Sequence, residues 1–431
     1  KLTFLDGAMG TMLQRHGLKL GEIPELLAIT NPELLTNIHR QYIEAGTEIV
    51  YANTFGANRR KMQKTPYTVA DVVSAAIAAA KKACIGTSAR VALDIGPLGE
   101  LLEPMGTLPF ETAVDMFAEI VDAGVNAGAD LICIETMTDL YEAKAALLAA
   151  KEHSTLPVWV TMSFDATGRT FTGCTIPSMA RTLEGLGADA IGLNCSQGPK
   201  QLLPLFQELC RVTTLPVIAK PNAGLPDPVD GHYDLPPEEF ARTMVDVVGA
   251  GVSIVGGCCG TTEEHIAALK AALKDAEYVR PAPECLDLLP AATEKEAFFL
   301  PADATHGAVL TADGDLEDKL SDAMDDEWPM VALKLASWAS GNIAGISTVG
   351  ALTGYAVETV AGTKPEKFKM LHRINASDEI AIDVETIDAS ALEDEIERTI
   401  AGRGSTGGTF NVTVLDKAVV CAVDGGHHLP A

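Results

Sequence analysis

The feature that most constrains this chain is a regular alternation, from residue 1 to about residue 278, of short apolar runs with longer Ala-rich stretches. Runs rich in Val, Ile and Leu predict buried strands, and the longer stretches have the spacing of amphipathic helices. Eight runs have strand character: 3–5, 48–52, 91–95, 131–134, 158–162, 190–193, 216–219 and 253–255. Eight βα units over this length predict a closed (β/α)8 TIM barrel, since an open doubly wound sheet usually has fewer strands.

The stretches between these runs predict helices, several of which end at a glycine. The helical pattern covers 32–45, 69–83, 110–123, 140–151, 176–186, 201–213 and 237–250. Glycines at 46, 128, 187 and 251 stand where such helices should end, each directly before the next strand. A glycine in this place is typical of a helix C-terminus that turns back towards a sheet.

A change of composition after residue 278 predicts a second domain. Pro-containing stretches at 280–283 and 289–292 indicate a linker over 279–297. Residues 298–431 then predict a small α+β domain of unknown role, with strands near 308–310, 380–382, 412–414 and 419–423 and helices around 330–339 and 391–400. The acidic run 313–326 is expected to be a solvated helix face or loop.

Charge and cysteine content restrict the class of protein. The formal net charge is -27, and such an acidic chain is a poor partner for nucleic acid or an anionic membrane face. No long uncharged apolar run predicts a membrane span. The nine cysteines are too sparse for a disulfide scaffold and their number is odd, so we expect reduced thiols and a cytoplasmic location. The first residue is Lys1, so a trimmed N-terminus or a removed leader stays open.

Three cysteines stand at the ends of two predicted strands. Cys195 follows the sixth strand, and Cys258 and Cys259 follow the eighth. Chemistry in these barrels lies at the carboxyl ends of the strands, and glycines around the pair let the backbone bend so that both side chains can face one ion. Three thiolates with an open fourth position are typical of catalytic zinc. The alternative is that Cys195 packs in the core and the vicinal pair is incidental.

Seven motifs that follow one another along the chain carry a resemblance to a known family. They are LDGAMGT (5–11), ANTFGAN (52–58), DIGP (94–97), ET (135–136), GLNCS (192–196), KPNAG (220–224) and GGCCGTT (256–262). In this order they resemble the homocysteine S-methyltransferase family, and most of all the homocysteine-binding module of cobalamin-dependent methionine synthase. The resemblance covers residues 1 to about 275 and implies a zinc barrel that binds homocysteine.

The resemblance also implies roles for single residues. Asn222 would be the fourth zinc ligand before substrate arrives, the alternative being an asparagine that hydrogen-bonds the loop at the strand end. Asp6 and Glu135 would hold the substrate ammonium, unless Asp6 only forms an Asx-turn and Glu135 only pairs with a nearby base. Backbone N–H groups near Gly7, Ala8 and Ser163 would receive the substrate carboxylate.

The expected activity is methyl transfer to homocysteine, giving methionine. Zinc turns a thiol into the nucleophilic thiolate, so no separate protein base is assigned. The spacing of Asp303 and His306 does not fit a corrinoid-binding motif, so methylcobalamin is expected in trans, on a corrinoid protein or free. S-methylmethionine or betaine as donor, and a non-catalytic module that only binds zinc and thiol, are the alternatives.

Overall fold

The computed structural model describes residues 1–19, 21–103, 105–227 and 233–274, a few single positions from 276 to 295, and eight strands between 288 and 424. The chain divides into two compact units. The barrel unit comprises residues 1–100, 112–172 and 187–282. The second unit comprises residues 101–111, 173–186 and 283–431.

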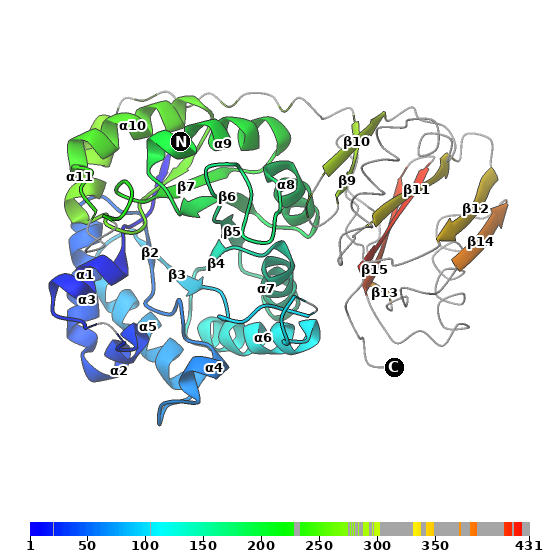
Figure 1. The fold of residues 1–431 in the computed structure, drawn as a ribbon. Helices are drawn as coiled ribbons and strands as arrows, with labels where there is room; N and C mark the ends of the chain where they lie inside the picture. Colours follow the sequence, from blue (N-terminus) through cyan, green and yellow to red (C-terminus); the bar gives the residue numbers. More distant parts are fainter. Residues whose placement is uncertain are drawn as a thin grey trace. The chain divides into compact units, whose positions relative to one another are not determined.

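Eight parallel strands form the centre of the barrel unit, as the sequence predicts (Figure 1). They are β1 (Thr3–Phe4), β2 (Ile49–Tyr51), β3 (Arg90–Ile95), β4 (Leu131–Met137), β5 (Val158–Met162), β6 (Ala190–Cys195), β7 (Val217–Pro221) and β8 (Ile254–Val255). Their order is β1-β8-β7-β6-β5-β4-β3-β2, and a parallel bridge between Leu5 and Ile49 joins the two ends of the sheet. The (β/α)8 prediction is therefore confirmed.

Helices follow the strands along the chain. They are α1 (Met9–Arg15), the 3-10 helix η1 (Pro24–Leu26), α2 (Leu27–Thr30), α3 (Pro32–Glu44), α4 (Arg59–Met62), α5 (Val69–Cys84), α6 (Phe110–Asn126), α7 (Leu140–His153), α8 (Ile176–Gly185), α9 (Pro199–Val212), α10 (Pro237–Gly249) and α11 (Glu263–Ala272). The seven predicted helices are α3 and α5 to α10, each within a few residues of its expected bounds. None of the helices in the described part of the chain combines the length and apolar character needed to cross a bilayer.

Glycine ends the helices where the sequence predicts it. Gly46, Gly128, Gly187 and Gly251 have φ values of +109°, +88°, +87° and +115°. This left-handed conformation costs a residue with a side chain about 1 kcal/mol or more, and glycine adopts it freely. The chain can therefore leave each helix and enter the next strand within a few residues.

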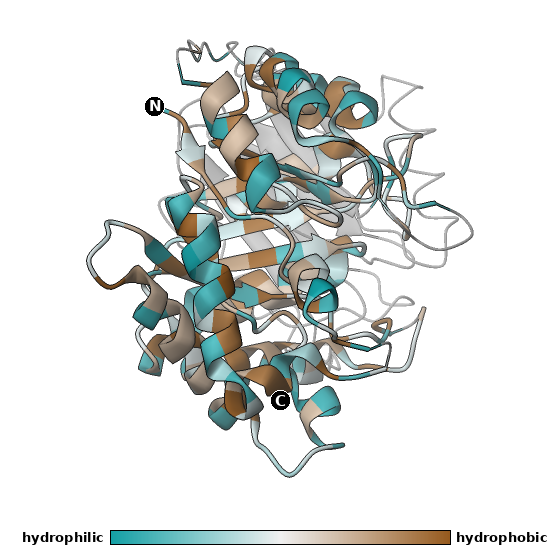
Figure 2. Cartoon of the chain, turned by 90° about the vertical axis from the view of Figure 1, so that its left-hand side faces the viewer, coloured by the Kyte–Doolittle hydropathy of each residue, from teal (hydrophilic) through white to brown (hydrophobic). Residues whose placement is uncertain are grey.

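Two apolar clusters hold the barrel unit together. One fills the inside of the sheet, with Leu5, Ile49, Leu131, Ile218 and Ile254 contributed by different strands. The other packs the helices α1, α2, α3, α5 and α11 against one another around Tyr42, which is fully buried. Figure 2 shows hydrophobic and hydrophilic residues alternating along these outer helices, as expected for helices with one face towards a core.

The described residues of the second unit beyond 283 are mostly antiparallel strands. β9 (Leu288–Ala292) pairs with β10 (Ala297–Pro301), and β12 (Asn342–Thr348) pairs with β14 (Ile380–Glu385). A four-stranded sheet has the order β11 (Val331–Ser337), β16 (Ala418–Asp424), β15 (Thr409–Leu415) and β13 (Met370–Leu371). The strands expected near 380–382, 412–414 and 419–423 are confirmed by β14, β15 and β16.

Two expectations for this unit differ from the structure. The helix expected around 330–339 is wrong, because β11 is a strand whose larger apolar residues Val331, Leu333 and Leu335 recur every second residue. β9 and the start of β10 lie within the expected linker 279–297; each is an edge of a two-stranded sheet, which tolerates Pro290. The expected helix 391–400, the strand 308–310, the acidic run 313–326 and the residues Asp303 and His306 lie outside the described residues.

Candidate active site

The structure brings the three predicted thiols together. The sulfur atoms of Cys195, Cys258 and Cys259 all lie within 4.8 Å of one another, and the Sγ atoms of Cys195 and Cys259 are 3.8 Å apart. Four ligands held at about 2.3 Å around a tetrahedral zinc ion are separated by about 3.8 Å. No other group of this kind occurs among the residues the structure describes. The thiol cluster therefore fits one zinc ion with a fourth position left open.

Backbone hydrogen bonds tie the loops after β6, β7 and β8 to one another. The N–H of Cys258 donates to the carbonyl of Pro221 (2.8 Å), and the N–H of Ala223 donates to the carbonyl of Cys259 (2.9 Å). Cys195 itself has a φ of +61°, in the left-handed region that residues with side chains rarely occupy. Such strain is typical of functional sites, and here it turns the Cys195 side chain out of the regular strand alternation.

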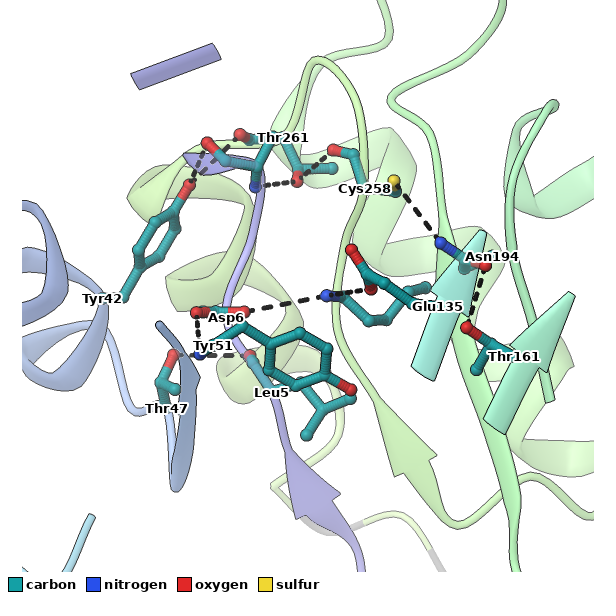
Figure 3. Close-up of polar contacts among 12 residues, drawn as sticks. Leu5, Asp6, Tyr42, Thr47, Tyr51, Glu135, Thr161, Asn194, Cys258 and Thr261 are labelled. Atoms are coloured by element: carbon teal, nitrogen blue, oxygen red, sulfur yellow. Dashed lines mark hydrogen bonds and ion pairs between the residues drawn. The ribbon is translucent and has the colours of Figure 1, made fainter. Parts of the chain in front are cut away.

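Thr261 fixes the turn that carries the vicinal pair (Figure 3). Its Oγ1 donates to the carbonyl of Cys258 (2.6 Å) and accepts from the N–H of Ala8 (3.2 Å). A Cβ added to Gly257 would lie 2.4 Å from the same Oγ1 atom. The glycine before the cysteine pair is thus required by close packing against Thr261, while Gly260 supplies the left-handed turn, with φ +79°.

The thiols share protons unequally. Hydrogen bonds from Cys258 and then Cys259 lower the pKa of Cys195 to about 3. The same contact with Cys195 raises the pKa of Cys259 to about 11, and that of Cys258 rises well above its usual range. One thiolate is therefore stabilised by its two thiol neighbours, and removing the remaining protons calls for a positive charge such as a metal ion.

Asn222 lies directly beside the thiols. Its backbone N–H donates to the carbonyl of Gln197 (2.9 Å), and its side chain interacts with Cys195. The Oδ1 atom of Asn222 is buried and has no hydrogen-bond partner. A buried amide oxygen without a donor is costly, and a metal ion would satisfy it.

The two predicted ammonium-binding carboxylates surround a lysine that the sequence analysis did not single out. The Nζ of Lys220, on β7, lies 3.0 Å from Oε2 of Glu135 and 3.8 Å from Oδ1 of Asp6. It also lies 3.5 Å from the centre of the Tyr51 ring. The ion pair considered for Glu135 is therefore present. Asp6 does not merely cap its own turn, because its Oδ2 accepts from the distant N–H of Tyr51 (2.7 Å; Figure 3).

Burial and neighbouring charges shift the pKa values of Asp6 and Lys220 in opposite directions. Burial raises the pKa of Asp6 to about 7, although Lys220 lowers it. Burial lowers the pKa of Lys220, but Glu135 and then Asp6 outweigh that effect, so the pKa of Lys220 is raised overall. The lysine is consequently a permanent positive charge.

One cavity of about 830 Å³ connects the thiols with the acids. Gly7 and Ala8, which are expected to receive the substrate carboxylate, also line it, whereas Ser163, expected to share this role, is absent from its lining. The N–H of Ser163 already donates to the carbonyl of Met137 (2.8 Å), and its hydroxyl donates to the carbonyl of Asn194 (2.9 Å). Ser163 therefore supports the strand ends and has no N–H left for a substrate carboxylate.

Two further residues shape the site. Asn194 is fully buried, and its Oδ1 accepts from the N–H of Thr136 (2.9 Å) and the hydroxyl of Thr161 (2.9 Å; Figure 3). His265, on α11, is only 6 % exposed, and its Nε2 contacts the carbonyl of Leu235 (2.9 Å). The position of Asn194 beside Cys195, in a run that is otherwise apolar, was a usable signal. No feature of the local sequence indicated the burial of His265.

The comparisons with known proteins agree with this geometry. Residues 3–273 match a family model described as homocysteine S-methyltransferase. The methionine synthase of Mycobacterium tuberculosis (strain ATCC 25618 / H37Rv) is 35% identical over 290 residues, and that of Mycobacterium leprae (strain TN) is 34% identical over 291 residues. Each alignment covers 62% of this chain and 24% of the relative, so the chain spans about a quarter of the length of these curated relatives.

Solved structures resemble the barrel as well. The homocysteine methyltransferase MmuM from Escherichia coli, in its oxidized form, superposes with a TM-score of 0.55 at 24% sequence identity. The match covers 63% of this chain and 95% of that one. Its metallated form gives the same TM-score and identity, covering 63% and 96%. At this identity the likeness concerns the fold.

Proposed function

Because the chain belongs to the homocysteine S-methyltransferase family, we propose that it transfers a methyl group to the sulfur of homocysteine and thereby forms methionine. We assign the activity to residues 1–278. The observation that carries the proposal is that the three thiols and the buried carboxylates line the same cavity. Homocysteine has the matching groups, a sulfur that a soft metal binds and an ammonium that a carboxylate binds.

Zinc is the cofactor that the thiol cluster fits. Cys195, Cys258 and Cys259 would hold it, and the unpartnered Oδ1 of Asn222 would complete the shell before substrate arrives. When bound, zinc supplies the positive charge that keeps a thiol deprotonated at neutral pH. The chain's own contribution is to hold the three sulfur atoms at tetrahedral spacing through the hydrogen bonds that join the loops after β6, β7 and β8.

The remaining residues would orient the amino acid end of the substrate. Asp6 and Glu135 face the cavity and accept hydrogen bonds from the ammonium, which brings one positive charge to a group with more carboxylates than cations. The turn at Gly7 and Ala8 lies beside them. Because the N–H of Ala8 already donates to Oγ1 of Thr261, Gly7 is the residue of this turn that would receive the substrate carboxylate. This arrangement directs the substrate thiol towards the cysteines and limits its freedom, which favours transfer.

The methyl donor is proposed to be a methylcorrinoid supplied in trans. Support comes from the curated relatives, which are methionine synthases. We place the reaction in the cytoplasm, since the described cysteine side chains are free thiols, a form that reducing compartments maintain.

The donor is tested by measuring methionine formation from homocysteine with methylcobalamin, S-methylmethionine and betaine in parallel. We expect turnover with methylcobalamin. Turnover only with S-methylmethionine or betaine would overturn the corrinoid assignment and keep the methyltransferase. A chain that binds zinc and homocysteine but forms no methionine from any donor would be a non-catalytic binding module.

A further inference from the structure

A third buried carboxylate, Asp94, faces the same cavity and has no role so far. It lies near the end of β3, is 7 % exposed and lines the cavity together with Asp6 and Glu135. Its backbone is held on both sides by Thr54, whose hydroxyl donates to the Asp94 carbonyl (2.7 Å) and accepts from the Asp94 N–H (3.0 Å). The position of the carboxyl group is therefore set by the strand.

The oxygen atoms of this acid group are not all satisfied. Oδ1 of Asp94 is buried and has no hydrogen-bond partner. Oδ1 of Asp6 has no hydrogen bond either and only the 3.8 Å ion pair with Nζ of Lys220. Buried carboxylate oxygens without a donor are costly, and natural structures rarely keep them unless a ligand supplies the donor. A primary ammonium brings three N–H donors, enough to serve more than one of these oxygens.

The charges of the buried acids also favour the binding of a cation. Asp6, Asp94 and Glu135 line one cavity with a single buried lysine, Lys220, whose Nζ already interacts with Glu135, Asp6 and the Tyr51 ring. The other carboxylate and the guanidinium in the cavity wall, Glu25 and Arg15, have partners of their own, Lys61 and Glu263. The imidazole of His265, also in the wall, contacts the carbonyl of Leu235. Burial first, and then repulsion from Glu135, raises the pKa of Asp94 well above its usual range. A further cation bound here would favour the ionised carboxylate and so oppose this rise in the pKa.

We propose that Asp94 is a third binding residue for the substrate ammonium. Together with Asp6 and Glu135 it forms an ammonium-binding site beside the positive charge of Lys220. This inference rests on the proposed function and adds a residue that selects for the primary ammonium of the substrate. Asp94 contributes directly to the preference for the amino acid, and its Oδ1 receives a donor when the ammonium is bound.

The test compares two ligands that differ in one group. Homocysteine and its desamino analogue 4-sulfanylbutanoate are titrated by calorimetry into the zinc-supplied full chain and into the variant Asp94→Asn. We expect the dissociation constant of homocysteine to rise by at least about tenfold in Asp94→Asn, the usual effect of losing a hydrogen bond to a charged group. The analogue should change by less than about threefold, since it has no ammonium to lose. The selectivity ratio is the affinity for homocysteine divided by the affinity for 4-sulfanylbutanoate. Both affinities are measured on the same variant, so the ratio does not depend on the fraction of active protein.

A matched control is Glu142→Gln, another buried carboxyl, which is absent from the cavity lining. It should leave the selectivity ratio unchanged. Asp94→Glu keeps the charge and should recover part of the preference for homocysteine. Equal weakening of both ligands in Asp94→Asn would make Asp94 a purely structural residue, and no weakening of either would remove it from the site. A wild-type chain that binds no homocysteine would instead overturn the proposed function.

Discussion

Single residues of this site are constrained to within a few tenths of an ångström. Gly7 is an example, because a Cβ built there would lie 2.8 Å from Oγ1 of Thr261 and 2.9 Å from the hydroxyl of Tyr42. Neither atom can retreat freely, since Thr261 bonds the Cys258 carbonyl and Tyr42 bonds the Ala8 carbonyl. One missing methyl group thus lets β1 approach the turn that carries two of the three thiols.

Gly7→Ala is expected to lower the free energy of unfolding by roughly 1–3 kcal/mol, the usual cost of overpacking. Homocysteine affinity should fall with it, because Thr261 must shift. Gly10→Ala is the matched control: a Cβ there meets nothing within 4 Å, and Gly10 lies inside α1. Alanine should stabilise that helix by about 0.5–1 kcal/mol. Denaturant unfolding and calorimetry measure both effects, and equal behaviour of the two variants would contradict the packing argument.

Cys258→Ser is expected to remove most of the bound zinc, because a hydroxyl is a far weaker ligand for this ion than a thiolate. The measurement is zinc per chain by elemental analysis after gel filtration. Cys84→Ser, at the half-buried end of α5 and far from the thiol cluster in sequence, should keep the wild-type content. Unchanged zinc in Cys258→Ser would remove the metal assignment.

Among the helices, α7 is unusual in burying charged groups near its N-terminus. Asp139 caps the helix by accepting from the N–H of Tyr141 (2.9 Å), and Glu142 accepts from the N–H of Leu98 (2.7 Å) in the loop after β3. Burial first raises the pKa of Glu142 to about 8, with Asp139 adding to the rise and the Leu98 N–H opposing it. Helix α7 is therefore joined to the loop after β3 through Glu142. The buried carboxyl of Glu142 also makes the stability of the fold depend on pH.

The sign of that dependence follows from the raised pKa. Between the ordinary value of 4.5 and about 8, the folded chain holds the Glu142 proton more firmly than the unfolded chain does. This contribution to stability is therefore lost as the pH rises through that window. Glu142→Gln cannot ionise and keeps an oxygen for the Leu98 N–H. Its stability relative to wild type should improve by on the order of a few kcal/mol from about pH 5 to about pH 8.

Urea unfolding at several pH values checks this prediction. Glu44→Gln, an exposed position at the end of α3, serves as the control for replacing a glutamate at the surface. A pH-independent difference between Glu142→Gln and wild type would mean that the buried carboxyl does not titrate in this window.

At the scale of the whole molecule, the barrel sequence is not confined to one unit. Helix α8 and residues 101–111 belong to the second unit, together with β9 and β10. Within that unit the N–H of Thr175, the N-cap residue of α8, donates to the carbonyl of Lys295 (3.0 Å). The segment beyond residue 278 is thus connected to a helix that the barrel pattern includes.

Shortened chains should separate these contributions. A chain ending at residue 301 keeps the β9–β10 pair and is expected to bind zinc and homocysteine as the full chain does. A chain ending at residue 278 should still bind both, with a melting temperature lower by roughly 2–4 °C because α8 loses the bond from Thr175 to Lys295. Differential scanning calorimetry and zinc analysis provide the readout. Loss of zinc from both chains would refute the assignment of the site to residues 1–278.

Much of the fold and the thiol cluster followed from the sequence, because parallel βα units impose a shared geometry. Strands of one barrel all end at the same rim, so cysteines directly after the sixth and eighth strands had to approach each other. The same rule brought Asp6 and Glu135 to that rim. The local pattern did not predict the strand over 330–339, because a short apolar stretch fits the period of a helix as well as that of a strand. Its antiparallel pairing with β16 makes this segment the strand β11.

What the tertiary structure alone decided are the contacts across the rim. The sequence identifies Lys220, Asp94 and Asn194 as polar residues in apolar runs, but the bond from Lys220 to Glu135 spans 85 positions in sequence. The burial of His265 beside Leu235 and the left-handed conformation of Cys195 likewise are not indicated by the local sequence. Local sequence encodes which backbone shape each segment prefers. Closure of the barrel determines which distant side chains meet and which buried oxygens are left without a donor.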